Sequence, residues 1–280
     1  MAKALKGIDI SSWNGTDIDW GWVGKNYDFC VIKCTGGMGY RNPHYAEQLQ
    51  GARGAGLIVG HYHYAVESSV PIGNPMGPGG EVEAIRFLQE SDIRPGEFAC
   101  LDLEDKQLPD DAEAWTLDWL HTVRNATGIT AFVYSFKSFM EERNLTTAAL
   151  AKFPLWYAFY WDSGKNTPIP KTIGAWTKID MWQWSGGIVI PQMPEEKVDQ
   201  NLYFGTADDL RGFGRSHMTE GEINQTPITT PAHDWGGSGV VRFHFEHMLV
   251  QNVETGVYYY KSSTNGTETE WLPVTPGTHE

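Results

Sequence analysis

Short apolar runs, each typical of a β-strand, alternate with helical patterns over the first half of the 280-residue sequence. The expected strands cover residues 6–10, 29–34, 56–64, 98–104 and 130–135, and the expected helices cover 44–55, 81–90, 110–126 and 136–143. Strands that alternate with helices build parallel β-α units. Three further runs, at 154–160, 178–184 and one ending at 201, follow without clear helices between them. The pattern predicts an α/β fold, an irregular (β/α) barrel with helices missing in its second half.

The composition changes after Phe213, which predicts a division into domains. Residues 1–213 are expected to form the barrel, and 214–232 are polar and Pro/Thr-bearing, as in a linker. Residues 233–280 contain short alternating runs at 240–246 and 256–261, which predict a small β-rich module. A segment of this size buries little surface alone, so we expect it to dock on the barrel or on a second copy of the chain.

The bulk charge and the apolar pattern exclude several classes of partner. A net charge of -14 argues against nucleic acids and anionic membranes. No apolar run approaches the ~20 residues of a membrane span. The first seven residues lack the apolar region of a signal peptide, so we expect synthesis in the cytoplasm of a host cell.

The cysteines predict neither a disulfide nor a metal site. Cys30 and Cys34 lie on one face of an expected strand, roughly 13 Å apart by strand rise and too far to bridge. Cys100 is distant in sequence, and the total of 3 is odd. Because no Cys-x-x-Cys or His-Glu-x-x-His spacing occurs, we expect reduced thiols, no metal and no cofactor.

Two carboxylates end the apolar run that begins at Phe98. On a strand, Asp102 and Glu104 would share one face, roughly 7 Å apart. At that separation they can act on one bond and shift each other's pKa, as glycosidic cleavage by a proton donor and a partner carboxylate requires. The alternative is a polar strand end that runs into a solvated loop.

Other strand ends favour a site over that alternative. In β/α barrels the reactive groups gather at the carboxyl ends of the strands. The polar and aromatic residues expected there are Asp9, Lys33, Tyr62, His63, Asp102, Glu104, Tyr134 and Asp199. Four carboxylates among them are more than solvation explains.

Several short motifs occur together in one order over about residues 1–210. They are Gly7-Ile-Asp9 with its Ser-Ser-Trp sequel, Val31-Ile-Lys-Cys-Thr-Gly36, Gly60-His-Tyr-His-Tyr64, Leu101-Asp-Leu-Glu104, Val133-Tyr-Ser135, Leu155-Trp-Tyr-Ala158, Trp182-Gln-Trp-Ser185 and Val198-Asp-Gln-Asn201. With these motifs the chain resembles glycoside hydrolase family 25, the muramidase lysozymes of bacteria and their phages. The resemblance implies a reduced β/α barrel that cleaves the β-1,4 bond between N-acetylmuramic acid and N-acetylglucosamine in peptidoglycan.

The resemblance also implies roles for single residues. Glu104 corresponds to the general acid and Asp102 to its partner carboxylate, and Asp9 and Asp199 correspond to the flanking catalytic acids. The residues expected to contact substrate are Tyr62, Tyr134, Lys33, Trp156 and Gln183. For Trp156 the alternative is core packing, and His63 is as well explained by packing as by participation. Whether a carboxylate or the 2-acetamido group of the substrate attacks is left open.

One position departs from the family pattern. Many members carry Glu where this chain has Gly36, which puts local hydrogen bonding and substrate preference in doubt. Activity is expected to survive, because that acid is not one of the main pair.

Three functions remain to be separated. The first is a phage endolysin of the muramidase type, which acts on the wall after the membrane is breached, with a C-terminal module that binds the wall. The second is a non-catalytic wall-binding protein on a decayed barrel, which would have lost acids that this chain keeps. A chitinase is the third, but its Asp-x-Asp-x-Asp-x-Glu strand is absent, since Cys100 stands two residues before Asp102. The module's alternative role is a fold-completing or self-association contact.

Overall fold

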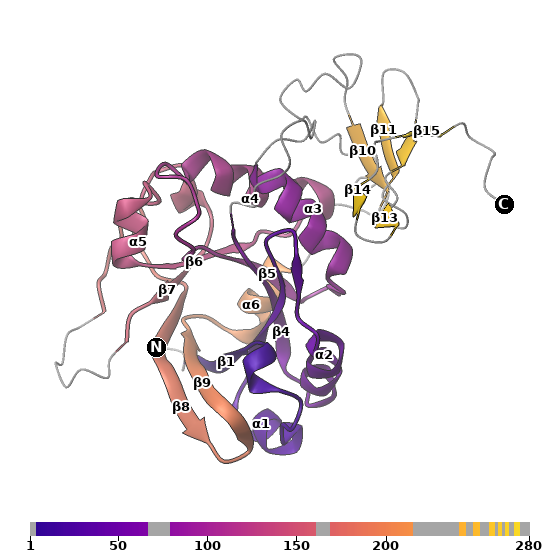
Figure 1. Cartoon of the computed structure of the whole chain (residues 1–280). Coiled ribbons are helices and arrows are strands. Elements are labelled where there is room, and N and C mark those ends of the chain that lie inside the picture. The colour runs from indigo at the N-terminus through magenta and orange to yellow at the C-terminus, as the bar shows by residue number, and fades with distance from the viewer. Residues whose placement is uncertain are drawn as a thin grey trace.

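Eight strands close into a barrel in the computed structural model of this chain (Figure 1). The structure describes residues 4–66, 79–160 and 169–214, and the backbone of six short strands between Val241 and Val274. The main sheet has the order β1-β9-β8-β7-β6-β5-β4-β2-β3, and an additional β1–β2 pairing closes it. The short β3 lies outside the closed ring, paired with β2 alone.

The strands and helices alternate through the first half of the barrel. The strands are β1 (Leu5–Ile10), β2 (Phe29–Gly36), β3 (Tyr40–Arg41), β4 (Ile58–Tyr64), β5 (Phe98–Asp102), β6 (Phe132–Phe136), β7 (Leu155–Ala158), β8 (Met181–Ile190) and β9 (Met193–Tyr203). The helices are α1 (Trp20–Asn26), α2 (Tyr45–Gly54), α3 (Gly80–Glu90), α4 (Glu113–Thr127), α5 (Lys137–Glu142) and α6 (Ala207–Phe213), with 3-10 turns at Ser12–Asn14 and Leu150–Lys152.

Strand β9 makes the barrel mixed rather than parallel. The other strands of the ring pair in parallel from β1 round to β8, whereas β9 pairs antiparallel with both β8 and β1. Only Pro191 and Gln192 separate β8 from β9, so the two form a hairpin with no room for a helix. Figure 1 shows this hairpin at the lower left, away from α2, α3, α4 and α5.

Side chains alternate between the barrel interior and the layer beneath the helices. The interior cluster includes Phe29, Val31, Tyr62, Phe98, Cys100, Phe132, Tyr134, Trp156 and Met181. The outer cluster joins the opposite strand faces to the helices, as in Leu101 on β5 with Trp119 and Leu120 on α4. Burying each large apolar side chain contributes about 1.5–3 kcal/mol, so these two layers are the main source of stability.

Glycines make room for aromatic rings inside the barrel. A Cβ on Gly7 would lie 2.2 Å from the ring of Phe29, and a Cβ on Gly60 would lie 2.6 Å from the ring of Phe98. Helix α6 follows β9 after a Thr206–Asp209 capping box and places Leu210 and Phe213 against the same interior cluster. It therefore covers the end of the barrel where the parallel strands begin.

The C-terminal strands form separate small sheets. An antiparallel sheet contains β10 (Val241–His244), β11 (Leu249–Asn252), β12 (Tyr258–Tyr260) and β15 (Leu272–Val274), and β13 (Ser263–Thr264) pairs with β14 (Thr267–Glu268). These strands fall within the β-rich module expected from the sequence. The expected linker lies outside the described residues except for Gly214, so the domain boundaries stay a prediction.

The expected α/β barrel with helices missing in its second half is confirmed. Two details differ. Strand β5 ends at Asp102, opposite the last residue of β4, so Glu104 lies two residues beyond the strand. Strand β8 begins at Met181 and continues to Ile190, because the antiparallel β9 extends the pairing beyond the barrel.

The cysteines also agree with expectation, since Cys30, Cys34 and Cys100 are free and buried. Among the residues that the structure describes, no helix is long and apolar enough to cross a membrane.

The close approach at Gly7 predicts a stability effect. In Gly7→Ala the added methyl group must displace the ring of Phe29, and such overpacking costs about 1–3 kcal/mol of unfolding free energy. The matched control is Gly54→Ala at the end of α2, where a Cβ meets nothing within 4 Å. Urea denaturation of both variants measures the difference. Equal midpoints for the two variants would contradict this packing argument.

Candidate functional site

Four carboxyl groups meet at the end of the barrel where the parallel strands finish. Asp9 lies near the end of β1, Asp102 is the last residue of β5, and Glu104 follows it. Strand β9 brings Asp199 directly opposite Asp9, although the two are distant in sequence. Asp9 and Asp102 are 8% and 6% exposed, whereas Glu104 is half-buried. The structure thus brings together all four acids that the sequence places at strand ends.

Two amides hold the carboxylate of Asp9 from below. The Nε2 of Gln183 on β8 donates a hydrogen bond of 3.0 Å to Asp9 Oδ2, and the Nδ2 of Asn201 on β9 donates one of 2.6 Å to the same oxygen. Both amides are buried. Hydrogen bonds to a charged acceptor are stronger than neutral ones, so these two donors fix the orientation of Asp9.

Aromatic residues orient the two amides in turn. The Oε1 of Gln183 accepts hydrogen bonds from the Tyr134 hydroxyl at 2.9 Å and the Tyr160 hydroxyl at 3.1 Å. The Oδ1 of Asn201 accepts one of 2.8 Å from the indole Nε1 of Trp156. Because each amide oxygen is occupied, each amide nitrogen must point at Asp9.

Asp9 and Asp199 share a proton at neutral pH. Their side chains are hydrogen-bonded to each other, which requires one of the two carboxyls to be protonated. Burial raises the pKa of Asp9 to about 6, against the lowering effect of its amide donors. Burial and the adjacent Asp9 raise the pKa of Asp199 to about 8, so Asp199 is the better holder of the proton.

Asp102 and Glu104 form a second acidic pair. Burial, followed by the charge of Glu104, raises the pKa of Asp102 well above its ordinary value, while Lys33 opposes the shift. Burial also raises the pKa of Glu104, again against Lys33. Both shifts favour the protonated forms of these carboxyls. Asp102 Oδ1 is buried and has no hydrogen-bond partner among the described residues.

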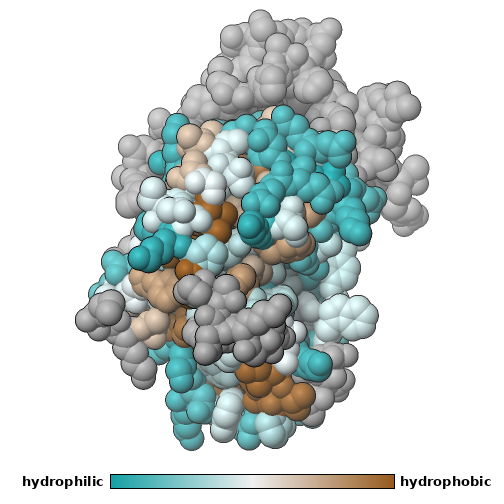
Figure 2. Space-filling model, turned by 90° about the vertical axis from the view of Figure 1, so that its left-hand side faces the viewer, coloured by the Kyte–Doolittle hydropathy of each residue, from teal (hydrophilic) through white to brown (hydrophobic). Residues whose placement is uncertain are grey.

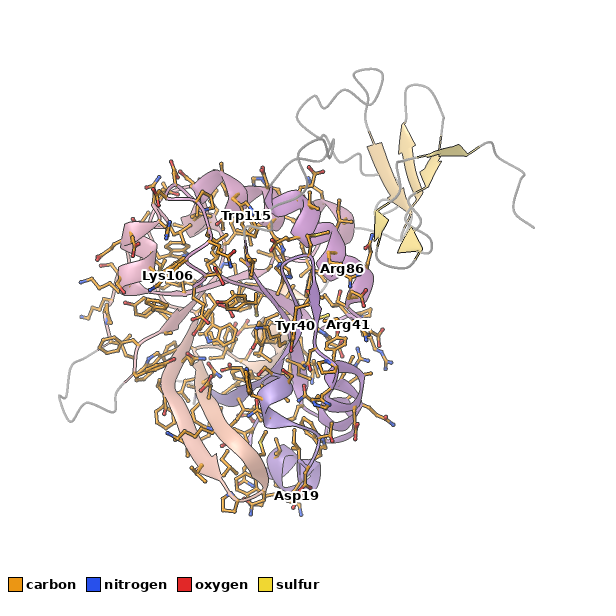
Figure 3. All side chains as sticks on the ribbon, in the orientation of Figure 1. Asp19, Tyr40, Arg41, Arg86, Lys106 and Trp115 are labelled. Atoms are coloured by element: carbon orange, nitrogen blue, oxygen red, sulfur yellow. The ribbon has the colours of Figure 1, made fainter. Side chains whose placement is uncertain are left out.

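Lys33 supplies the positive charge of the site from among tyrosine rings. Its Nζ lies 4.2 Å from the ring centroid of Tyr64, 5.4 Å from that of Tyr40 and 5.6 Å from that of Tyr62. Burial lowers the pKa of Lys33, and the charges of Asp102 and Glu104 raise it. Tyr40, which is labelled in Figure 3, lies on β3, the short strand beside β2. Its contact with Lys33 means that β3 contributes to the mouth of the barrel.

The residues expected to contact substrate occupy two levels. Tyr62, Tyr134 and Lys33 border the acids. Trp156 and Gln183 lie deeper, each 2% exposed. Gln183 bonds to Asp9 directly, whereas Trp156 bonds to Asn201, which in turn bonds to Asp9. Their placement favours positioning of Asp9 over direct contact with a sugar.

His63 lies on the other side of the sheet from the acids. Its ring bonds to Thr35 at 2.8 Å and to Glu83 at 2.8 Å, and it stacks on Trp119 of α4. This accounts for His63 as a buried packing residue.

Asn201 and Tyr160 belong to the site but are not among the site residues expected from the sequence. Asn201 belongs to the quoted motif Val198–Asn201, but nothing in a strand-end amide reveals its partner. Tyr160 follows β7 and is 44% exposed, yet its hydroxyl reaches Gln183. Both contacts join strands that are far apart in sequence, which explains why no local pattern signals them.

A cavity of about 630 Å³ opens beside Glu104. It lies between the start of α5 and the residues from Tyr157 to Tyr160, with Phe136 and Phe159 in its wall. Figure 2 looks at the side of the molecule where α5 and β7 lie in Figure 1, and there brown and pale surface alternates with teal. Within the part of the chain that the structure describes, no group of three or more His, Cys, Asp or Glu is arranged to hold a metal ion.

An acidic pair in a barrel mouth, with pKa values raised toward the protonated form, is the arrangement of a glycoside hydrolase. Comparison with known proteins agrees: the sequence matches Glycosyl hydrolases family 25 over residues 8–193. The uncharacterized protein YegX of Escherichia coli K12 is 31% identical over 219 residues, which cover 75% of this chain and 73% of YegX. Lysozyme M1 of Streptomyces globisporus is 25% identical over 226 residues, covering 74% of this chain and 70% of that protein.

The fold has solved counterparts as well. The catalytic domain of the endolysin ply40, from bacteriophage P40 of Listeria monocytogenes, superposes with a TM-score of 0.62 at 23% identity. The match covers 76% of this chain and 99% of that domain. The chain belongs to glycosyl hydrolases family 25. It is a glycoside hydrolase with muramidase activity, and its substrate is peptidoglycan.

The shared proton predicts a pH-dependent effect of Asp199→Asn. Because folding raises the pKa of Asp199 from 3.8 to about 8, the stability that this group contributes is complete below about pH 4 and is lost as pH rises through 8. The Asn variant keeps a hydrogen-bond donor for Asp9 and cannot ionise. We expect it to unfold with wild-type free energy at pH 4, and to be more stable than wild type at pH 8 by about 1–2 kcal/mol after allowance for solvent screening.

Urea denaturation at several pH values measures this difference. Asp17→Asn, at an exposed position on the loop after β1, is the control and should show no comparable trend. A constant difference between Asp199→Asn and wild type from pH 4 to 8 would contradict the shared proton.

Proposed function

We propose that the chain is an endolysin that cleaves the β-1,4 bond between N-acetylmuramic acid and N-acetylglucosamine, with Glu104 as general acid and Asp102 as partner carboxylate. The observation that carries the assignment is the difference in exposure within the acidic pair. Glu104 is half-buried and lines the cavity, whereas Asp102 lies deeper at the end of β5. A proton donor must reach the glycosidic oxygen, and Glu104 is the more accessible of the two.

Glu104 donates its proton to the leaving-group oxygen as the bond breaks. Burial and the charges of Asp9 and Asp105 raise its pKa, which favours the protonated form that a general acid needs. Once ionised, Glu104 can take a proton from the water molecule that completes hydrolysis.

Asp102 meets the positive charge that develops on the sugar. Asp102 is two residues from Glu104 at the end of β5, and we propose that it either attacks the sugar carbon or holds the 2-acetamido group while that group attacks. Lys33 stabilises the ionised form of Asp102, since its charge opposes the rise in the pKa of that carboxyl. For this role Asp102 must be ionised before Glu104 gives its proton to the leaving group.

Asp9 and Asp199 form a polar floor of the site that carries little net charge. With one proton between them they carry a single negative charge, and the amides of Gln183 and Asn201 hold that charge in place. Tyr62 and Tyr134 border this floor and are proposed to contact the sugar, together with Lys33.

The endolysin role has its own support. The fold is that of the endolysin catalytic domain ply40, and strands β10, β11, β12 and β15 follow the barrel as a further sheet. We propose that this segment binds the cell wall and raises the local concentration of the enzyme on its polymer. The enzyme would be made in the host cytoplasm and would meet the wall after the membrane is breached.

Substitution of the acids tests the catalytic assignment. Glu104→Gln removes the proton donor and should lower kcat for wall digestion by about 10²–10⁴-fold without weakening wall binding. Asp102→Asn should lower kcat to a similar degree. Glu142→Gln, the same change on the solvent-exposed end of α5, is the matched control and should keep wild-type activity.

The product identifies the bond. Digested walls are reduced with borohydride, and the reduced sugar is identified by mass spectrometry. Muramitol ends that vanish in Glu104→Gln support the proposal, while glucosaminitol ends would mean that the other bond is cleaved. Wall binding without new ends would favour the alternative of a non-catalytic binding protein.

Deletion of residues 220–280 tests the wall-binding role. The truncated chain should bind whole walls at least about tenfold more weakly, because one of two linked binding sites is lost. Its cleavage of short soluble fragments should stay close to that of the full chain. Equal losses on both substrates would mean that the segment belongs to the barrel fold or to a dimer contact.

A further inference from the structure

The cavity beside Glu104 contains features that a neutral sugar does not require. Its rim carries one charge of each sign, because Lys137 and Glu141 both line it. Their ammonium and carboxylate groups lie 3.8 Å apart, and the side chains are 69% and 60% exposed. An exposed pair of this kind contributes little to stability, so a ligand can replace either partner.

The inner wall of the cavity holds an unused hydroxyl. Tyr157 on β7 is fully buried and lines the cavity, and its phenolic oxygen has no hydrogen-bond partner among the described residues. Buried polar atoms are nearly always paired, so an exception in a residue that lines a cavity is a candidate partner for a ligand or a water molecule. Ser138 adds a second hydroxyl at the edge of the cavity.

The remaining wall is apolar. Phe136, Ala158 and Phe159 supply it, and Phe159 lies parallel to Tyr157 with ring centroids 6.5 Å apart. A volume of about 630 Å³ accommodates a ligand of several residues. The cavity therefore suits a short chain that carries methyl groups, amides, carboxylates and an amine.

Peptidoglycan contains such a chain next to its sugars. Each muramic acid carries a lactyl ether at O3, and a short peptide with carboxylates, small apolar side chains and an amino group continues from it. A glycan chain without peptide offers no cation for Glu141 and, beyond the lactyl carboxylate, no anion for Lys137. Charge complementarity therefore favours the peptide over a further N-acetylglucosamine.

We propose that the cavity lined by Lys137, Glu141 and Tyr157 binds the peptide stem of a muramic acid next to the cleaved bond. The inference rests on the proposed function, since Glu104 connects the cavity to the chemistry. Lys137 binds a stem carboxylate, Glu141 accepts a hydrogen bond from the stem amine, and the Tyr157 hydroxyl pairs with a peptide group. The stem thereby makes the enzyme selective for glycan that still carries its peptides.

The test compares two forms of one polymer. Uncrosslinked glycan strands are prepared with their stems, and half are stripped by an amidase that cuts between the lactyl group and the peptide. The full-length enzyme should cleave the stem-bearing strands with a kcat/KM about tenfold higher, which corresponds to one charge-assisted contact. In Lys137→Ala and Tyr157→Phe the ratio of the two kcat/KM values should fall about three- to tenfold.

Controls make the outcome specific. Lys152→Ala removes an exposed lysine that does not line the cavity, and its ratio should equal that of the wild type. Tyr157→Phe removes one buried oxygen without a partner, so loss of folding does not explain a change in that variant. A free tetrapeptide stem should inhibit cleavage of stripped strands by the wild type more strongly than cleavage by Lys137→Ala.

The failures are distinguishable. A wild type that cleaves both strands equally overturns the stem site and leaves the muramidase assignment intact. If di-N-acetylchitobiose competes in place of the tetrapeptide and its inhibition depends on Lys137, the cavity holds sugar and the proposal is overturned. A wild type that cleaves neither strand overturns both the stem site and the proposed function.

Discussion

The site depends on the antiparallel strand that closes the barrel. Strand β9 lies between β8 and β1, and this position sets Asp199 opposite Asp9 and Asn201 beside Gln183. In a fully parallel barrel, a crossover connection would separate β8 from β9. The hairpin instead brings two polar residues of β9 to the inner face near the mouth. Through them the first and last strands of the barrel jointly form the acidic floor.

Charge is distributed over this floor so that few buried groups are ionised at once. Asp9 and Asp199 share a proton, burial raises the pKa values of Asp102 and Glu104, and Lys33 offsets part of the remaining negative charge. Burying several unpaired carboxylates would be very costly, and proton sharing avoids most of that cost. In the proposed mechanism, the proton on Glu104 that limits the buried charge is also the proton that the reaction uses.

Much of the barrel could be predicted from the sequence, because its signals are local. Strand and helix patterns alternate in the first half, and the acids follow apolar runs whose ends must gather at one face of a β/α barrel. The direction of β9 could not be predicted, since alternation of side chains is the same for parallel and antiparallel strands. The hydrogen bond between Asp9 and Asp199 follows from that direction.

The depth at which a residue lies in the site could not be predicted from the sequence either. Trp156 and Gln183 face the barrel interior like Tyr62, but only the packed structure distinguishes a buried support from a group at the surface of the site. The cavity beside Glu104 depends on how α5 approaches the end of β7, which no motif records. Local sequence therefore predicts which acids gather at the strand ends, while the residues that support them depend on contacts between distant strands.

The same antiparallel strand has a consequence for everything that follows the barrel. Strand β9 ends at Tyr203, beside the first residues of β1 and β8, so the chain leaves the barrel at the end remote from the acids. Helix α6 then seals that end with Leu210 and Phe213. Segments joined after Gly214 begin far from the cleavage site and need no shape complementary to it. The architecture thus suits exchange of C-terminal modules between enzymes, since a new partner can be fused there without rebuilding the mouth of the barrel.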